Sequence, residues 1–514
     1  MNLRSTFLAI PCLLIATTAI SQEKPTKTCK PCESFKQLVL PDVTIEKTEA
    51  HIRDTIPASQ FEPAVIINTP FCRLQGIIGK EIAFELYLPQ NWNGRFLMSG
   101  NGGFAGRFQN SLTPYISQGF AVAATNTGHS GFSEIQADWA LNNMERQLNF
   151  GHLAVHRTTV VSKSLINAAY CKPPSYSYFV GCSRGGGQAL MEAQRYPDDY
   201  DGIVAGAPAF GWPAIGAKGI SIIQKNYLDP KNLATPVITQ DNLKLLQEFV
   251  CKECDLQDGL SDCILNEPNA CKPDFGKLPR CPGNVASKDC FTESQISAIK
   301  AIFDPLVLDG QQVYPGYPLG LEAIDGGIDL WIAGTSPFLK PSLHYYFSTG
   351  IFKYLVYNNP NFNYQAYNFN NFFRETAYAS AYLDATNPDY SAFRNSKGKM
   401  IIYHGWNDPA LSANATIQHY EEAMAKNPDL SSFIRLYLLP GVLHCAGGPG
   451  ADYVDYVQLI REWVEKGNAP EKVVFEKRET GKTVMTRPVY PYPKVAVYDG
   501  KGDPKKESSF VLKK

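Results

Sequence analysis

Short apolar runs that predict buried β-strands occur on both sides of the middle of the chain, at residues 95–99, 176–180 and 399–403. A stretch of helical composition, residues 188–196, follows the second run, and another apolar run, residues 200–208, follows that helix. Strands that alternate with helices are typical of parallel βαβ units. The pattern therefore predicts an α/β fold.

This alternation fades between residues 212 and about 396, where proline, glycine, cysteine and aromatic residues dominate. It returns at residues 399–403 and again at residues 433–439. A chain of 514 residues is long enough for a second domain or a large insertion. We therefore predict a segment inserted between two parts of one α/β domain.

The first 21 residues have the pattern of a secretory signal peptide. Arg4 precedes an apolar run at residues 7–20, and small residues at 19–21 provide a cleavage site near Ser21. The run is too short for a membrane span, and the alternative interpretation is a buried N-terminal strand. We predict a periplasmic or secreted protein.

Export changes what the cysteines predict. Cys12 leaves with the signal peptide, so twelve of the thirteen cysteines remain. An even number of cysteines in an oxidising compartment predicts disulfide bonds.

The charge balance argues against two classes of partner. The formal net charge is −1, so no overall field favours nucleic acid or an anionic membrane. No segment after the signal peptide has the length and composition of a membrane span. The oligomeric state stays open.

Gly181-Cys182-Ser183-Arg184-Gly185 fits the G-x-S-x-G pattern of a nucleophile elbow. The pattern alone occurs by chance, but here it lies between a predicted strand and a predicted helix, which is the context of the elbow. We therefore predict that Ser183 is a catalytic nucleophile.

A serine nucleophile needs a base, and the base needs an acid that orients it. Asp408 follows the strand predicted at residues 399–403, and His444 follows the strand predicted at residues 433–439. This is the chain order of such an acid and base after a G-x-S-x-G serine. The alternative interpretations are a turn aspartate before a proline and an ordinary loop histidine.

A cysteine adjoins the predicted nucleophile and another adjoins the predicted base, Cys182 beside Ser183 and Cys445 beside His444. A bond between these cysteines would join the nucleophile turn to the histidine loop. Catalysis weakens when nucleophile and base drift by an ångström, so we predict a positioning disulfide.

The Cys-Ser, Asp and His-Cys trio resembles the tannase and feruloyl esterase family. The similarity extends over nearly the whole mature chain, through motifs at residues 100–104, 125–129, 206–208, 404–408 and 487–498. The resemblance implies an α/β-hydrolase fold with a large inserted lid domain. It divides the chain into a signal peptide (1–21), a first hydrolase part (22–211), a lid domain with a calcium loop (212–396) and a second hydrolase part (397–514).

The resemblance also implies a structural Ca²⁺ site. Asp255, Asp258 and Asp262 match the family's side-chain ligands, and Leu260 and Ile264 match its carbonyl ligands. Carboxylate and carbonyl oxygens are the ligands that Ca²⁺ prefers. By composition alone the segment would be an acidic surface turn.

An oxyanion hole needs backbone N–H groups aimed at the developing negative charge. The residue after the nucleophile, Arg184, is one expected donor. We favour Gly103, in the glycine loop after residues 95–99, as the second. The alternative interpretation of Gly103 is an ordinary glycine turn.

Three further disulfides are implied by the resemblance, and the other four cysteines are left without an assigned partner. The implied pairs are Cys254–Cys271, Cys281–Cys290 and Cys32–Cys72, and the unassigned cysteines are Cys29, Cys171, Cys251 and Cys263. The chain departs from the family at Tyr490, where a cysteine is common, so a C-terminal disulfide is not expected.

These observations predict a secreted serine carboxylic-ester hydrolase that acts on small esters of hydroxycinnamic or gallic acids. Aromatic residues around 345–347 and 352–354 are a candidate wall for the acyl ring, although lid core explains most of them. An arginine clamp is the usual holder of a substrate carboxylate. Because Arg280 is the only arginine between residues 196 and 373, neutral phenolic acyl esters are favoured over terephthalate monoesters.

Two alternatives to this function stay open from the sequence. One is a calcium-stabilised protein that binds polyphenol or carbohydrate without turnover, and the other is a serine peptidase on the same fold. The intact trio argues against the first, because binding alone needs none of these residues.

Overall fold

A mixed sheet of nine strands runs through the computed structural model, which describes residues 29–57, 64–131 and 133–513. The predicted signal peptide lies outside the described residues. The strand order is β1-β4-β5-β7-β6-β8-β9-β12-β13. The bounds are β1 Val43–His51, β4 Phe71–Ile78, β5 Ile82–Pro89, β6 Arg95–Ser99, β7 Ala121–Thr125, β8 Tyr176–Cys182, β9 Gly202–Gly206, β12 Lys399–Gly405 and β13 Ile434–Leu439.

The sheet is antiparallel from β1 to β7 and parallel from β7 to β13. All the predicted strands belong to this sheet, as β6, β8, β9, β12 and β13. Successive side chains of a strand point to opposite faces. Phe96 and Met98 accordingly pack in one core cluster, and Leu97 packs in the other. Both faces are covered, as expected for parallel strands that read as continuous apolar runs.

Helices cover the two faces of the sheet. α2 (Ala154–Tyr170), α3 (Arg184–Arg195) and α10 (Ala413–Lys426) contribute to the core on one face. α11 (Tyr456–Lys466) contributes to the core on the other face. The predicted α/β class is therefore confirmed.

Helix α3 begins earlier than the sequence predicts, at Arg184 instead of residue 188. Gly186 and Gly187 have poor helix propensity, and for this reason the sequence does not predict the first turn of the helix. Their missing side chains are needed for packing, because a Cβ on Gly187 would lie 1.9 Å from Ala209 O and one on Gly186 would lie 2.1 Å from Gly206 O. Close packing of helix and strand loops outweighs propensity here.

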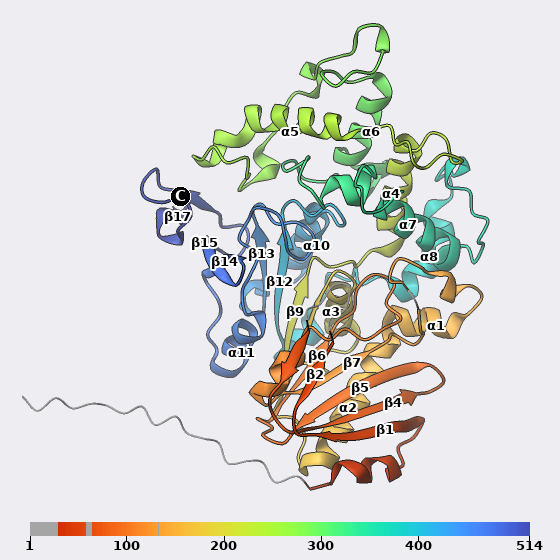
Figure 1. Ribbon diagram of the computed structural model, residues 1–514, viewed down its shortest axis with the longest axis vertical. Coiled ribbons are helices and arrows are strands. Elements are labelled where there is room, and N and C mark those ends of the chain that lie inside the picture. The colour runs from red at the N-terminus through yellow and green to blue at the C-terminus, as the bar shows by residue number, and fades with distance from the viewer. Residues whose placement is uncertain (1–28, 58–63, 132, 514) are drawn as a thin grey trace, which may run out of the picture.

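Residues 207–398 leave the sheet between β9 and β12, which pair directly with each other. Its regular elements are mainly helices, and Figure 1 shows these helices gathered at one end of the sheet. One apolar core lies wholly within this segment, and another is shared with residues outside it such as Phe104 and Phe150. Its elements are α4 Trp212–Asn226, α5 Gln240–Cys254, α6 Glu293–Phe303, β10 Leu306–Leu308, β11 Gln311–Tyr314, α7 Leu343–Gly350, α8 Phe372–Leu383 and α9 Ser391–Asn395.

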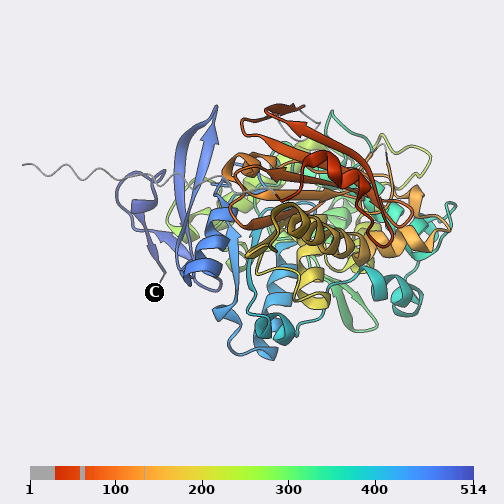
Figure 2. The ribbon, with the colours of Figure 1, turned by 90° about the horizontal axis from the view of Figure 1, so that it is seen from below.

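Short elements complete the described structure. Two C-terminal hairpins, drawn in blue, project at one side of the sheet in Figure 2. The bounds of the remaining elements are β2 Asp54–Ile56, β3 Val65–Ile67, α1 Met144–Leu148, β14 Val473–Glu479, β15 Lys482–Val489, β16 Ala496–Tyr498 and β17 Phe510–Leu512. None of the helices in the described part of the chain has the length and hydrophobicity of a membrane span.

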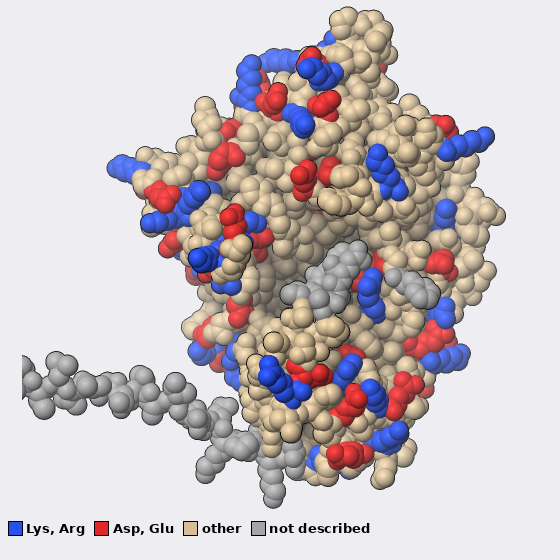
Figure 3. Space-filling model, in the orientation of Figure 1, with Lys and Arg blue, Asp and Glu red and all other residues tan. Residues whose placement is uncertain are grey.

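Charges of both signs are interspersed on the face shown in Figure 3. Lysine and arginine alternate with aspartate and glutamate over both the sheet region and the helical segment. No large patch of one sign is visible on that face.

Six disulfides link the twelve cysteines that follow Cys12. The predicted pairs Cys182–Cys445, Cys254–Cys271, Cys281–Cys290 and Cys32–Cys72 are confirmed. The four unassigned cysteines form Cys29–Cys171 and Cys251–Cys263.

Candidate active site

Ser183 lies on the sharp turn between β8 and α3. Its backbone has φ 63° and ψ −119°, which is unfavourable for a non-glycine residue. Glycine on both sides makes the turn sterically feasible, because a Cβ on Gly181 would lie 2.7 Å from Gly185 backbone atoms. A strained serine between strand and helix, with its side chain held outward, is the geometry of a nucleophile elbow.

Asp408 and His444 come from neighbouring strands of the sheet. Asp408 follows β12 and His444 follows β13, and the two strands run parallel, so their carboxyl ends lie at the same edge. His444 Nδ1 is 2.7 Å from Asp408 Oδ2. His444 and Ser183 line the same pocket. The structure thus brings the predicted nucleophile, base and acid to one place.

The Asp408 carboxylate is fully buried and heavily hydrogen-bonded. Its Oδ1 accepts from the Ala410 and Leu411 backbone N–H groups at 2.8 and 2.9 Å. Burial by itself raises the pKa of Asp408, but the charges and hydrogen bonds of His444 and His404 outweigh burial and hold that pKa well below its ordinary value. Asp408 is therefore ionised throughout the neutral range.

The Cys182–Cys445 disulfide connects the two loops that carry Ser183 and His444. Each cysteine is the immediate neighbour of one of these residues, and the bond closes a separation of 263 residues along the chain. It is therefore the covalent link between the β8–α3 turn and the loop after β13.

Gly103 and Arg184, whose backbone N–H groups are the predicted oxyanion-hole donors, both line the pocket. No acceptor within the described part of the chain receives either N–H. Gly103 has φ 49°, and a Cβ there would lie 2.3 Å from Glu134 O, so only glycine fits. Arg184 is the first residue of α3, where helix N–H groups favour negative charge.

The Arg184 side chain has surroundings that the sequence does not reveal. Its guanidinium lies 4.3 Å from the Phe150 ring centroid and 5.3 Å from that of Trp212. It donates to Phe150 O and to Gly151 O. Burial lowers the pKa of Arg184 to about 9. Nη2 is thus engaged with the protein, whereas Nε and Nη1 are buried without a hydrogen-bond partner among the described residues.

The remaining pocket wall is mainly apolar and encloses about 50 Å³. Trp331 packs edge-on against His444, with ring centroids 4.9 Å apart, and stacks on Phe347 at 6.0 Å. The other lining residues are Ala209, Trp212, Ile215, His344, Ser348, Ile351, Ala410 and Leu411.

Of the aromatic residues expected at the wall, Phe347 lines the pocket and Phe352 packs in the core of the helical segment. Trp331 was missed, because nothing in its local sequence sets it apart from a core residue. Within the described lining, Arg184 is the one arginine or lysine.

The predicted calcium loop follows α5. Asp255 and Asp258 are buried, and Asp255 Oδ1 has no hydrogen-bond partner. Burial, together with the charge of Asp262, raises the pKa of Asp258 to about 6. Arg487 Nη2 lies 3.9 Å from Asp262 Oδ2 and is the nearby cation. Three carboxylates beside one arginine, with an orphaned buried oxygen, are the donors that a hard divalent cation takes. In the described structure these three side chains do not bring one oxygen each within 4.8 Å of one another.

A different trio in the described structure brings ligand-type atoms within 4.8 Å of one another, namely His156, Glu192 and Asp199. His156 Nδ1 is 2.7 Å from Asp199 Oδ2. Lys163 donates to Asp199 O and so already places a cation beside the cluster. These residues form a hydrogen-bonded network that links α2, α3 and Asp199, which follows α3.

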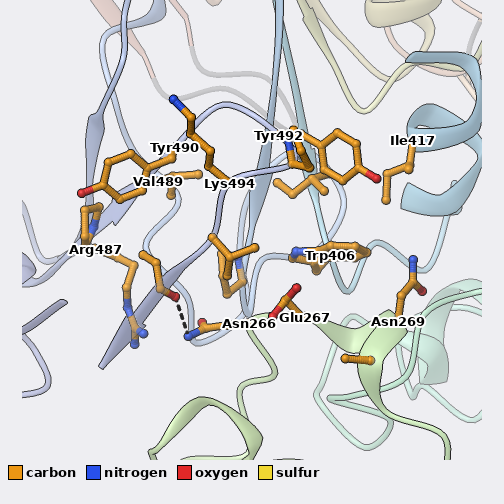
Figure 4. Close-up of a pocket in the computed structure, with 17 residues that line it drawn as sticks. Asn266, Glu267, Asn269, Trp406, Ile417, Arg487, Val489, Tyr490, Tyr492 and Lys494 are labelled. Atoms are coloured by element: carbon orange, nitrogen blue, oxygen red, sulfur yellow. Dashed lines mark hydrogen bonds between the residues drawn. The ribbon is translucent and has the colours of Figure 1, made fainter. Parts of the chain in front are cut away.

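A second pocket lies between Trp406, which follows β12, and the C-terminal residues 487–496 (Figure 4). It has a volume of about 210 Å³, and Trp406, Tyr490 and Tyr492 contribute to its wall. Asn266 Nδ2 donates to Ala496 O at its base, at 3.2 Å. The pocket contains none of the predicted site residues. Tyr490, at the position where the resemblance implies that a cysteine is common, lies in this wall.

The fold and the convergence of a serine elbow with an Asp–His pair are typical of serine hydrolases with the α/β-hydrolase fold. Residues 69–512 match the family model described as tannase and feruloyl esterase. The chain belongs to the tannase and feruloyl esterase family.

Similar proteins agree with this assignment. The chain is 30% identical to feruloyl esterase B of Aspergillus niger, with 96% of each chain covered. It is 29% identical to mono(2-hydroxyethyl) terephthalate hydrolase of Piscinibacter sakaiensis, covering 93% of this chain and 91% of that one. The crystal structure of feruloyl esterase B from Aspergillus oryzae superposes with a TM-score of 0.83 at 26% identity, covering 94% of this chain and 99% of that one.

The predicted family, α/β-hydrolase fold and ester-hydrolase activity are thereby confirmed. Neither alternative from the sequence, the non-catalytic binding protein or the peptidase, gains support from these relatives.

Proposed function

We propose that the protein hydrolyses esters of aromatic acids through Ser183, His444 and Asp408. One observation carries this proposal. His444, which lines the same pocket as Ser183, lies 2.7 Å from the buried, ionised Asp408. The disulfide beside Ser183 and His444 supports a shared task for the two loops.

In the proposed mechanism, Ser183 Oγ attacks the ester carbonyl carbon while His444 Nε2 accepts its proton. Asp408 accepts the hydrogen bond from Nδ1 and stabilises the imidazolium. The Gly103 and Arg184 amides hold the oxyanion. His444 then protonates the departing alcohol, and water attacks the acyl-enzyme with His444 again as base.

We propose hydroxycinnamic or gallic acid as the acyl group. The apolar wall with Trp331 and Phe347 suits an aromatic ring, and the enclosed 50 Å³ suits the reacting ester, with the rest of the substrate toward the mouth. Arg184, the cation in the described lining, is engaged with Phe150 and Gly151. These features favour a neutral acyl ring.

The relative named mono(2-hydroxyethyl) terephthalate hydrolase favours a second candidate, a terephthalate monoester. The two candidates differ in a carboxylate on the acyl ring. An unengaged arginine or lysine in the pocket would favour the second.

We further propose a structural Ca²⁺ held by Asp255, Asp258 and Asp262 with the Leu260 and Ile264 carbonyls. When bound, the ion supplies positive charge that relieves repulsion among these carboxylates. The six disulfides support export to an oxidising compartment, periplasmic or extracellular.

The test compares wild type with Ser183→Ala on methyl ferulate, methyl gallate and a terephthalate monoester. We expect turnover of the first two, weaker turnover of the third, and loss of all activity in the variant with thermal stability nearly unchanged. Near-wild-type activity of the variant would overturn the triad, and a preference for the terephthalate monoester would overturn the neutral-ring assignment.

A further inference from the structure

A second histidine contacts the carboxylate that orients His444. His404, near the end of β12, is completely buried. Its Nε2 lies 3.2 Å from Asp408 Oδ2, the same oxygen that His444 Nδ1 approaches at 2.7 Å. The mechanism proposed above does not use His404.

The surroundings of His404 determine which ring nitrogen carries a proton. Nε2 also lies 3.0 Å from the carbonyl oxygen of Leu411, which can only accept a hydrogen bond. Nε2 therefore carries hydrogen and faces both Leu411 O and Asp408 Oδ2. Nδ1 lies 2.8 Å from Thr416 Oγ1, a hydroxyl that can donate to it. The ring is thus held at both nitrogens, at Nε2 by the loop that contains Asp408 and Leu411 and at Nδ1 by Thr416 of α10.

We propose that His404 is a positioning residue that holds Asp408 in place for His444. The proposal rests on the proposed triad. Ala410 and Leu411 N–H groups hold Asp408 Oδ1, whereas the partners of Oδ2 among the described residues are His444 and His404. Without His404, Oδ2 would be oriented by His444 alone, the group it is meant to orient.

Loss of the His404 donor has a predictable electrostatic sign. A carboxylate that loses a hydrogen-bond donor binds protons more tightly, and its charge acts more strongly on the remaining imidazole. Both effects raise the pH at which the Asp408–His444 pair becomes competent, so the acidic limb of kcat/KM moves to higher pH. The other titratable groups that interact with Asp408 are Tyr314, Tyr317, Tyr403 and His344. Burial raises the tyrosine pKa values and lowers the His344 pKa to about 4, so none of these changes charge near neutral pH.

Two substitutions separate the donor from the volume of the ring. His404→Gln keeps an N–H near the position of Nε2, and His404→Phe keeps a ring without a donor. We expect the Gln variant to stay within about threefold of wild-type kcat/KM, and the Phe variant to lose at least about tenfold with its acidic limb shifted to higher pH. Titration with an organophosphonate that phosphonylates the serine, with release of its leaving group, counts the active sites.

His419→Phe is the matched control. His419 is also buried and hydrogen-bonded, to Tyr390 at 2.8 Å, and lies outside the pocket. Its substitution should lower the melting temperature without moving the pH limb.

Should the buried Phe variant fail to fold, Thr416→Val provides the test, because it removes the hydroxyl that holds Nδ1 with little change in volume. We expect a smaller loss of kcat/KM than in His404→Phe, with the acidic limb again shifted to higher pH.

Equal losses in the Gln and Phe variants, or losses without a shift of the acidic limb, would show a packing role and overturn the proposal. Wild-type kinetics in both variants would also overturn it. Failure of the triad itself is distinguishable, since Ser183→Ala would then retain activity.

Discussion

At the residue scale, the environment of a single buried side chain decides its protonation and therefore its effect on stability. Asp408 is buried among hydrogen-bond donors and stays ionised, whereas Glu322 is buried with little compensation. Glu322 Oε1 accepts from Gly320 N at 2.6 Å, while Oε2 has no partner. Burial raises the pKa of Glu322 from 4.5 to about 7.

Glu322→Gln should therefore remove a pH-dependent loss of stability. The folded state keeps its proton between pH 4.5 and 7 while the unfolded state releases it, so the contribution of Glu322 is full below pH 4.5 and is lost as pH rises through 7. At about 1.4 kcal/mol per pKa unit, the free energy of unfolding of the wild type falls by about 3 kcal/mol between these two pH values. Denaturant unfolding at pH 4.5 and pH 8 measures the difference.

Glu462→Gln serves as its control, because 29% of the Glu462 side chain is solvent-accessible and Glu462 pairs with Lys466 at 2.7 Å. We expect its stability to follow the wild-type pH dependence. A Glu322→Gln variant with the same pH dependence as wild type would contradict the assignment of a protonated Glu322.

At the element scale, two loops from different parts of the chain must keep Ser183 and His444 in register. β8 and β13 are separated in the sheet by β9 and β12, so no strand pairing connects the two loops directly. The Cys182–Cys445 bond makes that connection covalently. Its position suits control of geometry as well as chain entropy.

The double variant Cys182→Ala with Cys445→Ala should fold, since the large core and five other disulfides remain. Its kcat/KM should fall at least about tenfold, equivalent to about 1.4 kcal/mol of transition-state stabilisation. Steady-state kinetics per titrated site measures this loss. Removal of Cys281–Cys290, which is remote from the pocket lining, is the matched control. Unchanged turnover per folded molecule, together with lower stability, would show that the disulfide stabilises the fold without positioning Ser183 and His444.

The predicted calcium loop is a second element whose stability depends on a local charge balance. Metal removal should lower the melting temperature, because repulsion among Asp255, Asp258 and Asp262 would return, and an ion at 100 times its Kd contributes about 2.7 kcal/mol. The pH profile of activity should not change. Calorimetry with and without chelator, and with Ca²⁺ restored, tests this. Indifference to chelator in a protein that contains no metal would count against the site.

At the scale of the whole molecule, the sheet unites the two ends of the chain around the helical segment. β9 and β12 pair in parallel although residues 207–398 separate them. The same segment supplies Trp331 and Phe347 to the pocket wall, while Ser183, Asp408 and His444 come from loops at the sheet edge. The residues of the proposed chemistry and those of the proposed substrate contacts thus lie on different parts of the chain.

Much of the candidate site could be predicted from local sequence. Ser183 was predictable because Gly181 and Gly185 are sterically required by the turn that presents it. Asp408 and His444 were predictable because each follows an apolar strand. The start of α3 was not, because Gly186 and Gly187 have poor helix propensity and are there for packing.

The sequence by itself predicted the α/β class and the order of the proposed nucleophile, acid and base, because these depend on short local patterns. It also predicted the Cys182–Cys445 bond, because each cysteine adjoins a residue of the candidate site. Only the tertiary structure decided that Cys29 pairs with Cys171, that Trp331 packs on His444 and that His404 faces Asp408. These contacts join side chains whose neighbours in the chain do not distinguish them from core residues. Their partners are chosen by how helices and loops pack around the sheet, and that packing is a property of the whole chain.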